Sequence, residues 1–241
     1  MAEKEKSYLS IDANGRIYTR TDENNELATK VILKDGTPTY REYRKYGSID
    51  GKITRMNIGE VTFDGRTLKR LFIHIENDTN IDVFSLNVWS QGGSMDGYTQ
   101  SIAMICPMLD KDTNYTIRPA VKPNAKGRVP RNLYVTNSDT REWLKLPDEK
   151  YKELPEAIVK VRADGVKTYD FGERNDVLYK QLEAFIQENY PYTGEFSSEP
   201  VSEKLPDMDL SEGKAAKPKT TRQPVVEPDP VVDVTDEELP F

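Results

Sequence analysis

A fixed succession of alternating apolar segments dominates residues 49–136 and limits the folds open to this chain. Three period-2 runs come first, and the pair Asp64-Gly65 between the first two is typical of a hairpin turn. A helical repeat then places Tyr98, Ile102 and Ile105 on one stripe, and two more period-2 runs follow. The predicted strands cover residues 49–63, 68–76, 81–89, 114–122 and 132–136. This order predicts a mainly β protein built on a small five-stranded Greek-key barrel at about residues 47–140.

Weaker signals flank the predicted barrel on both sides. Residues 17–20 and 27–34 predict two strands of an N-terminal β extension. Residues 141–146 and 157–161 predict short strands after the barrel. The stripe of Leu178, Leu182, Phe185 and Ile186 predicts a C-terminal helix over residues 176–189. We therefore expect one elaborated domain over residues 1–194.

The composition changes sharply after residue 194. Residues 195–241 hold 12 acidic and 5 basic residues, 7 of the 15 prolines and only two aromatic residues, while the first 194 residues are electrically neutral. A segment with so few aromatics and so much clustered charge cannot bury enough apolar surface to offset the entropy of the chain. The sequence therefore predicts a disordered acidic tail over residues 195–241.

Catalysis, metal binding and membrane insertion lack the residues they need. Cys106 and His74 are the single Cys and the single His, which excludes an internal disulfide and a zinc site. The chain has no Gly-rich phosphate loop and no nucleophile elbow, so we expect no enzymatic activity and no cofactor. The longest apolar stretch, 102–106, is far shorter than the ~20 residues of a membrane span. Residues 1–6 lack the apolar core of a secretory signal. We expect no membrane partner and a cytoplasmic location, in the host cell if a phage encodes the chain.

A basic segment lies between the fourth and fifth predicted strands. Residues 118–131 read RPAVKPNAKGRVPR, with five bases and no acid. In a barrel of this strand order, this loop flanks a groove for oligonucleotides, and phosphates attract such a loop whatever the base sequence. Strand alternation predicts that Arg118, Lys122 and Tyr134 point outward. The inward positions are then Ile117, Val121, Leu133 and Val135.

Aromatic residues occur in phase with basic residues at several places, which suits bases that stack while cations follow the phosphates. Arg141, Trp143 and Lys145 share one predicted face, and Trp89 falls on the polar side of its strand. His74 shares a face with Arg70 and Phe72, where it is either a rim histidine or a group that stacks or contacts phosphate. The candidate DNA-binding residues are Tyr43, Arg44, Lys45, Arg70, Phe72, His74, Trp89, Arg118, Lys122, Lys126, Arg128, Arg131, Tyr134, Arg141 and Trp143.

The chain end carries the most specific motif. Residues 236–241 read Asp-Glu-Glu-Leu-Pro-Phe and follow a proline-rich approach. This end resembles the acidic tip of bacterial-type single-stranded DNA-binding proteins, and the elaborated body looks more like the bacteriophage members of that family. The resemblance implies an OB fold, which is the barrel inferred above. It also implies that the tip binds partner proteins through Asp236, Glu237, Glu238, Leu239, Pro240 and Phe241.

These features together predict a protein that coats single-stranded DNA in phage replication, recombination and repair. Its tip is expected to recruit replication proteins such as DNA polymerase, primase, helicase or recombinase. Two alternatives stay open: a virion or scaffolding protein that makes protein contacts only, and an OB-fold regulator that binds RNA. The sequence also leaves open whether copies of the chain associate as a homo-oligomer.

Overall fold

The computed structural model describes residues 4–33, 36–63, 66–90, 92–124, 127, 129–163 and 165–191. The turn Asp64-Gly65, the two loop cations Lys126 and Arg128, and the predicted tail 195–241 with its tip 236–241 lie outside the described residues.

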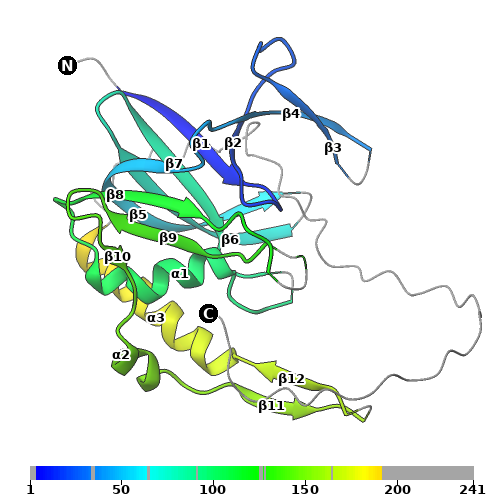
Figure 1. Ribbon diagram of the computed structural model, residues 1–241, viewed down its shortest axis with the longest axis vertical. Helices are drawn as coiled ribbons and strands as arrows, with labels where there is room; N and C mark the ends of the chain where they lie inside the picture. The colour runs from blue at the N-terminus through cyan, green and yellow to red at the C-terminus, as the bar shows by residue number, and fades with distance from the viewer. Residues whose placement is uncertain are drawn as a thin grey trace, which may run out of the picture.

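Ten strands form one mixed sheet in the spatial order β10-β9-β8-β5-β6-β7-β1-β2-β4-β3 (Figure 1). Neighbouring strands are antiparallel except β1 and β7, which run parallel. The strands are β1 (Glu5–Ile11), β2 (Ile17–Arg20), β3 (Thr29–Ile32), β4 (Pro38–Tyr43), β5 (Ile49–Phe63), β6 (Arg66–Glu76), β7 (Asn80–Asn87), β8 (Asn114–Pro119), β9 (Leu133–Asn137) and β10 (Trp143–Leu144). A mainly β protein is therefore confirmed.

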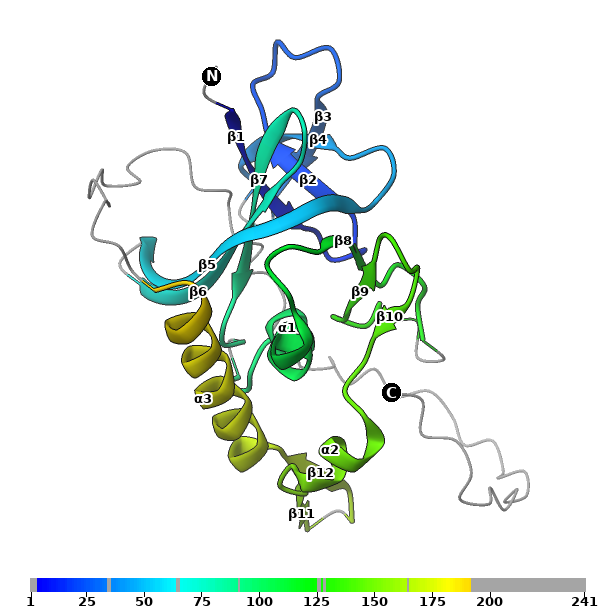
Figure 2. The same cartoon turned by 90° about the vertical axis from the view of Figure 1, so that its left-hand side faces the viewer.

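Three helices and a separate hairpin complete the described structure. The helices are α1 (Gly97–Ile105), which continues into the short 3-10 helix η1 (Cys106–Met108), α2 (Asp148–Glu153) and the C-terminal α3 (Gly172–Asn189). The hairpin pairs β11 (Ile158–Val161) with β12 (Lys167–Asp170). It lies at the opposite end of the molecule from β3 and β4 (Figure 2). No helix in the described part of the chain is long and apolar enough to cross a membrane.

One core lies between the sheet and the helices α1 and α3. On β6 the alternation predicted from the sequence holds, because Leu71, Ile73 and Ile75 are buried on the core side. Ile102 of α1 and Leu178 of α3 belong to the same buried cluster. Burial of one strand face against amphipathic helices is the layered arrangement that stabilises such domains. The predicted C-terminal helix is confirmed and begins four residues earlier than expected.

The expectation of a closed five-stranded barrel is wrong for the described residues. The pairs β5–β6, β6–β7, β5–β8 and β8–β9 all form, but no pairing joins β7 to β9. Instead, the free edge of β7 binds β1, with Tyr8 opposite Val83. An edge strand offers unpaired N–H and C=O groups, and β1 satisfies those of β7. The sheet therefore stays open and continues into β2, β4 and β3.

The N-terminal extension is larger than the sequence indicates. The two predicted strands are present as β2 and β3, but β1 and β4 were not predicted. The polar residues Ser7 and Ser10 interrupt the apolar pattern of β1. Its partner β7 lies about seventy residues further along the chain, beyond the reach of a local pattern. These four strands place tyrosines and arginines beside β6 and β7.

Candidate nucleic-acid interface

Two exposed aromatic side chains stand side by side on β9 and β10. Tyr134 is 40% exposed and Trp143 is 55% exposed, and their rings meet edge to face with centroids 5.6 Å apart. Arg118 of β8 lies directly opposite Tyr134 in the sheet register. The alternation that turns Leu133 and Val135 into the core turns these side chains outward.

Basic residues that have no ion-pair partner among the described residues lie beside this aromatic pair. Arg118, Arg141 and Lys145 are exposed, and their side chains make no hydrogen bond or ion pair to a described residue. We call Arg118, Tyr134, Arg141, Trp143 and Lys145 the β8–β10 surface. Free cations beside exposed π faces are the two components of a site for single-stranded nucleic acid.

The loop between β8 and β9 contributes in part. Lys122 is exposed and has no described partner, as expected. Val121 was expected to point inward but is exposed, because β8 ends at Pro119 and the strand alternation ends with it. Arg131 already has partners within the protein. Its guanidinium lies 2.7 Å from the buried carboxylate of Asp96 and 4.9 Å from the Tyr98 ring centroid. Its positive charge is therefore offset within the protein.

The outer face of β6 differs from the β8–β10 surface in burial. Arg70 is only 5% exposed and donates a hydrogen bond from Nη2 to the Ser85 carbonyl, so the sequence prediction of an accessible cation is wrong there. Burial lowers the pKa of Arg70 to about 10, against the opposing charges of Tyr18 and Asp96. Phe72 is half-buried beside it.

His74 is half-buried on the same face as Phe72. Burial, followed by the positive charges of Arg55 and Lys6, lowers the pKa of His74 to about 4. The imidazole is therefore neutral at pH 7 and adds no charge toward phosphate. Whether it stacks on a base stays a prediction.

Arginines and tyrosines of the N-terminal extension are stacked on one another. The Arg41 guanidinium lies 4.3 Å from the Tyr18 ring centroid, and Arg16 lies 4.2 Å from that of Tyr43. The two tyrosine rings are 5.9 Å apart. We call Arg16, Tyr18, Arg41 and Tyr43 the arginine–tyrosine cluster. Tyr43, a predicted DNA contact, therefore already has a cation over its ring.

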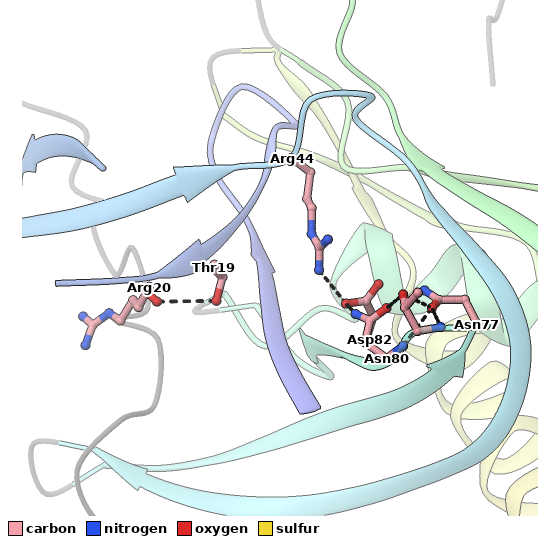
Figure 3. A network of polar contacts seen from close by, with 7 residues as sticks. Thr19, Arg20, Arg44, Asn77, Asn80 and Asp82 are labelled. Atoms are coloured by element: carbon pink, nitrogen blue, oxygen red, sulfur yellow. Dashed lines mark hydrogen bonds and ion pairs between the residues drawn. The ribbon is translucent and has the colours of Figure 1, made fainter. Parts of the chain in front are cut away.

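Arg44 and Lys45 follow this cluster in the chain. The Arg44 guanidinium lies 2.6 Å from Asp82 Oδ1, and Asn80 donates to the same carboxylate (Figure 3). This bridge ties the segment after β4 to β7. Lys45 is exposed and lies 5.5 Å from the ring centroid of Tyr46. Arg44 therefore has a structural partner, and Lys45 remains accessible.

Trp89 lies away from the polar face that the sequence assigned to it. Regular pairing of β7 ends at Asn87, and the indole packs against Tyr179 of α3 with centroids 5.2 Å apart. It also contacts the hydrophobic core. The expected position of Trp89 on the polar side of its strand is therefore wrong, because the regular pairing of β7 ends at Asn87 and Trp89 forms an isolated bridge with Met95 instead.

A cavity of about 470 Å³ opens beside the β8–β10 surface. It lies between β9, β10 and the helices α1 and α2. Its lining residues are Gln100, Ser101, Met104, Ile105, Asn132, Leu133, Tyr134, Trp143, Leu144, Lys145, Leu146, Asp148, Tyr151 and Arg174. The sequence did not indicate this cavity, because its lining comes from four separate stretches of the chain and from no periodic pattern.

The described residues differ from a metal site and from a reactive-thiol site in two respects. They contain no cluster of three or more His, Cys, Asp or Glu that would hold a metal ion. Cys106 is buried, and burial raises the pKa of its thiol to about 12, which leaves no reactive thiolate at neutral pH.

Comparisons with models of known protein families, with curated protein sequences and with solved structures find no match.

Proposed function

We propose that this chain is a single-stranded DNA-binding protein of a phage type, which acts by binding and not by catalysis. The β8–β10 surface holds the strand. The observation that supports this proposal best is the exposed Tyr134–Trp143 pair flanked by Arg118 and Lys145, two cations without a partner among the described residues. Aromatic faces stack on any base, and the cations follow the backbone.

We further propose that β5 to β9 form an OB-type unit that is open between β7 and β9. The order of three strands, the helix α1 and two strands supports this assignment, as do four of the strand pairs that such a unit requires. In that fold the loop between the last two strands borders the DNA path. Here this loop joins β8 to β9 and carries Lys122.

Trp143 provides both the binding contact and the signal for the test. In a Trp89→Phe background, the fluorescence of Trp143 is followed while oligo-dT is added at several salt concentrations. We expect quenching at low salt and weaker binding as salt rises. Trp143→Ala, followed by fluorescence anisotropy of labelled DNA, should lose roughly 1–3 kcal/mol of binding free energy. The matched control is Tyr169→Ala, which removes a similarly exposed ring from β12.

Three outcomes would contradict this proposal or part of it. Absence of binding to any single strand would contradict it and favour a protein that makes protein contacts only. Tighter binding to an RNA of equal length would favour the RNA regulator. Equal losses from Trp143→Ala and Tyr169→Ala would show that the β8–β10 surface is not the binding surface.

The acidic tip completes the proposal on the basis of the sequence. The residues Leu239, Pro240 and Phe241 present apolar side chains and a terminal carboxylate, which suit a partner with a cleft and a basic pocket. Deletion of Phe241 should abolish capture of the replication polymerase and leave DNA affinity unchanged. Retained capture would show that the tip is not the docking segment.

A further inference from the structure

The cavity beside Trp143 has the size and shape of a small-molecule site. Its volume of about 470 Å³ lies within the range typical of ligand pockets. Met104, Ile105 and Leu133 contribute apolar lining, and the lining residues Tyr134 and Trp143 also belong to the β8–β10 surface. A strand bound on that surface therefore passes the mouth of the cavity.

Two carboxamides in the lining favour a heterocycle over an aliphatic side chain. Gln100 and Asn132 are both lining residues of the cavity, and their side chains make no hydrogen bond to a described residue. Each carboxamide offers both a donor and an acceptor. This is the combination that pairs with the edge of a nucleobase, whereas an apolar peptide side chain would leave both groups unsatisfied.

The charges of the lining define the orientation of the bound nucleotide. Arg174 is held by the Pro155 carbonyl at 2.8 Å and the Tyr151 hydroxyl at 2.9 Å, so it forms a fixed wall. Asp148 is exposed in the lining and repels phosphate. Lys145 has no described partner. A nucleotide with its base inside the cavity and its phosphate at Lys145 pairs that phosphate with a cation and places the uncharged base, not the phosphate, toward Asp148.

We infer that this cavity takes one unstacked base of the bound single strand and hydrogen-bonds its edge through Gln100 and Asn132. The inference rests on the proposed function and adds base selectivity to it. A single strand suits this mode because an unpaired base leaves its neighbours at low energetic cost. Stacking on Tyr134 and Trp143 alone would be nearly indifferent to the base.

The test compares base preference in the full-length chain and in a double variant. Affinities for oligo-dT, oligo-dA and oligo-dC of equal length are measured for the wild type, for Gln100→Leu with Asn132→Leu, and for Gln187→Leu as control. Gln187 is exposed on α3, thirteen residues beyond the lining residue Arg174, and is not a lining residue itself. We expect the double variant to bind the preferred strand about tenfold more weakly, because a lost base-edge contact has that magnitude. Its affinities for the three strands should then be about equal. The salt dependence should stay unchanged, since no charge is removed.

The single variant Asn132→Asp guards against misfolding, because it keeps the size of the side chain and replaces its donor. It should shift the order of base preference, with an unfolding curve like that of the wild type. Wild-type binding with the same preferences in every variant would overturn the base pocket and leave the proposed function intact. Failure of the wild type to bind any strand would overturn the proposed function itself. Quenching of Trp143 by a peptide ending in Leu-Pro-Phe, and by no nucleotide, would assign the cavity to the chain's own tip.

Discussion

The arginine–tyrosine cluster and the β8–β10 surface combine the same residue types, but they differ in whether a cation lies over an aromatic ring. In the cluster, Arg41 and Tyr18 are 4% and 2% exposed, and the cation lies over the ring. On the surface, Arg118 is exposed without a described partner, and the Tyr134 ring meets only another aromatic ring. A cation and a ring that satisfy each other stabilise the fold, whereas unsatisfied groups at the surface remain available to a ligand. We therefore expect pairing within the protein to separate structural from functional basic–aromatic residues better than composition does.

The largest expected effect is a loss of stability in the cluster. Tyr18→Ala removes a buried ring that contacts Tyr43 and Arg41, and it should lower the free energy of unfolding by about 3 kcal/mol. Trp143→Ala should lower it by less than about 1 kcal/mol, because the indole is mostly exposed. Urea denaturation of both variants measures the difference. Equal losses would remove the distinction between the two regions.

The next effect concerns charge on the β8–β10 surface. Arg118→Gln with Lys145→Gln should weaken binding of oligo-dT and reduce the slope of log affinity against log salt by roughly 0.7 for each lost phosphate contact. Lys167→Gln, an exposed cation on β12, serves as the control and should leave the slope unchanged. A slope that responds to Lys167 as strongly as to Arg118 would mean that binding follows net charge and no particular surface.

Sequence reasoning succeeds where one local pattern decides the outcome. The bounds of β5 follow from its apolar pattern and the turn signal Asp64-Gly65, and the inward positions of Leu71, Ile73 and Ile75 follow from period-2 alternation. The outward positions of Tyr134 and Trp143 follow in the same way. These are statements about neighbours along one strand, for which alternation is a direct steric rule.

It fails where distant segments meet. Arg70 alternates correctly on its strand, yet it is buried near Tyr18, which belongs to an extension that pairs with β7 through an unpredicted strand. Gln100 and Asn132 share a cavity although helix and strand periodicities treat them separately. The carboxylate of Asp96 neutralises Arg131, which lies a similar number of residues away in the sequence. Long-range pairing decides which charges are free, and a single sequence does not encode it in any local period.

A smaller effect comes from His74, which is half-buried and in this respect resembles the arginine–tyrosine cluster more than the β8–β10 surface. Because burial and the charges of Arg55 and Lys6 lower its pKa to about 4, the folded protein binds a proton less readily than the unfolded chain. Stability therefore falls as pH drops from about 6.5 toward 4. His74→Gln should remove this component, which amounts to about 1 kcal/mol after allowance for partial exposure. The check is the difference in unfolding free energy between wild type and variant at pH 7 and pH 5. If this difference does not change with pH, the pKa of His74 in the folded protein is that of a histidine in water.

The smallest expected effect comes from removing the ion pair between Asp96 and Arg131, so that Arg131 becomes available to a ligand. Asp96 caps α1 by accepting a hydrogen bond from the Tyr98 amide, and its other oxygen lies 2.7 Å from Arg131. Asp96→Asn keeps a capping oxygen but removes the negative charge, since Asn and Asp cap helices about equally well. Arg131 should then contact phosphate, and affinity for oligo-dT at low salt should rise roughly two- to threefold, the scale of one partly exposed ion pair. Asp96→Ala is the contrasting variant, because it also loses the cap and should cost about 1 kcal/mol of stability. If Asp96→Asn leaves both affinity and salt slope unchanged, the position of Arg131 keeps it from the strand, and pairing with an acid is not what distinguishes the two kinds of basic residue.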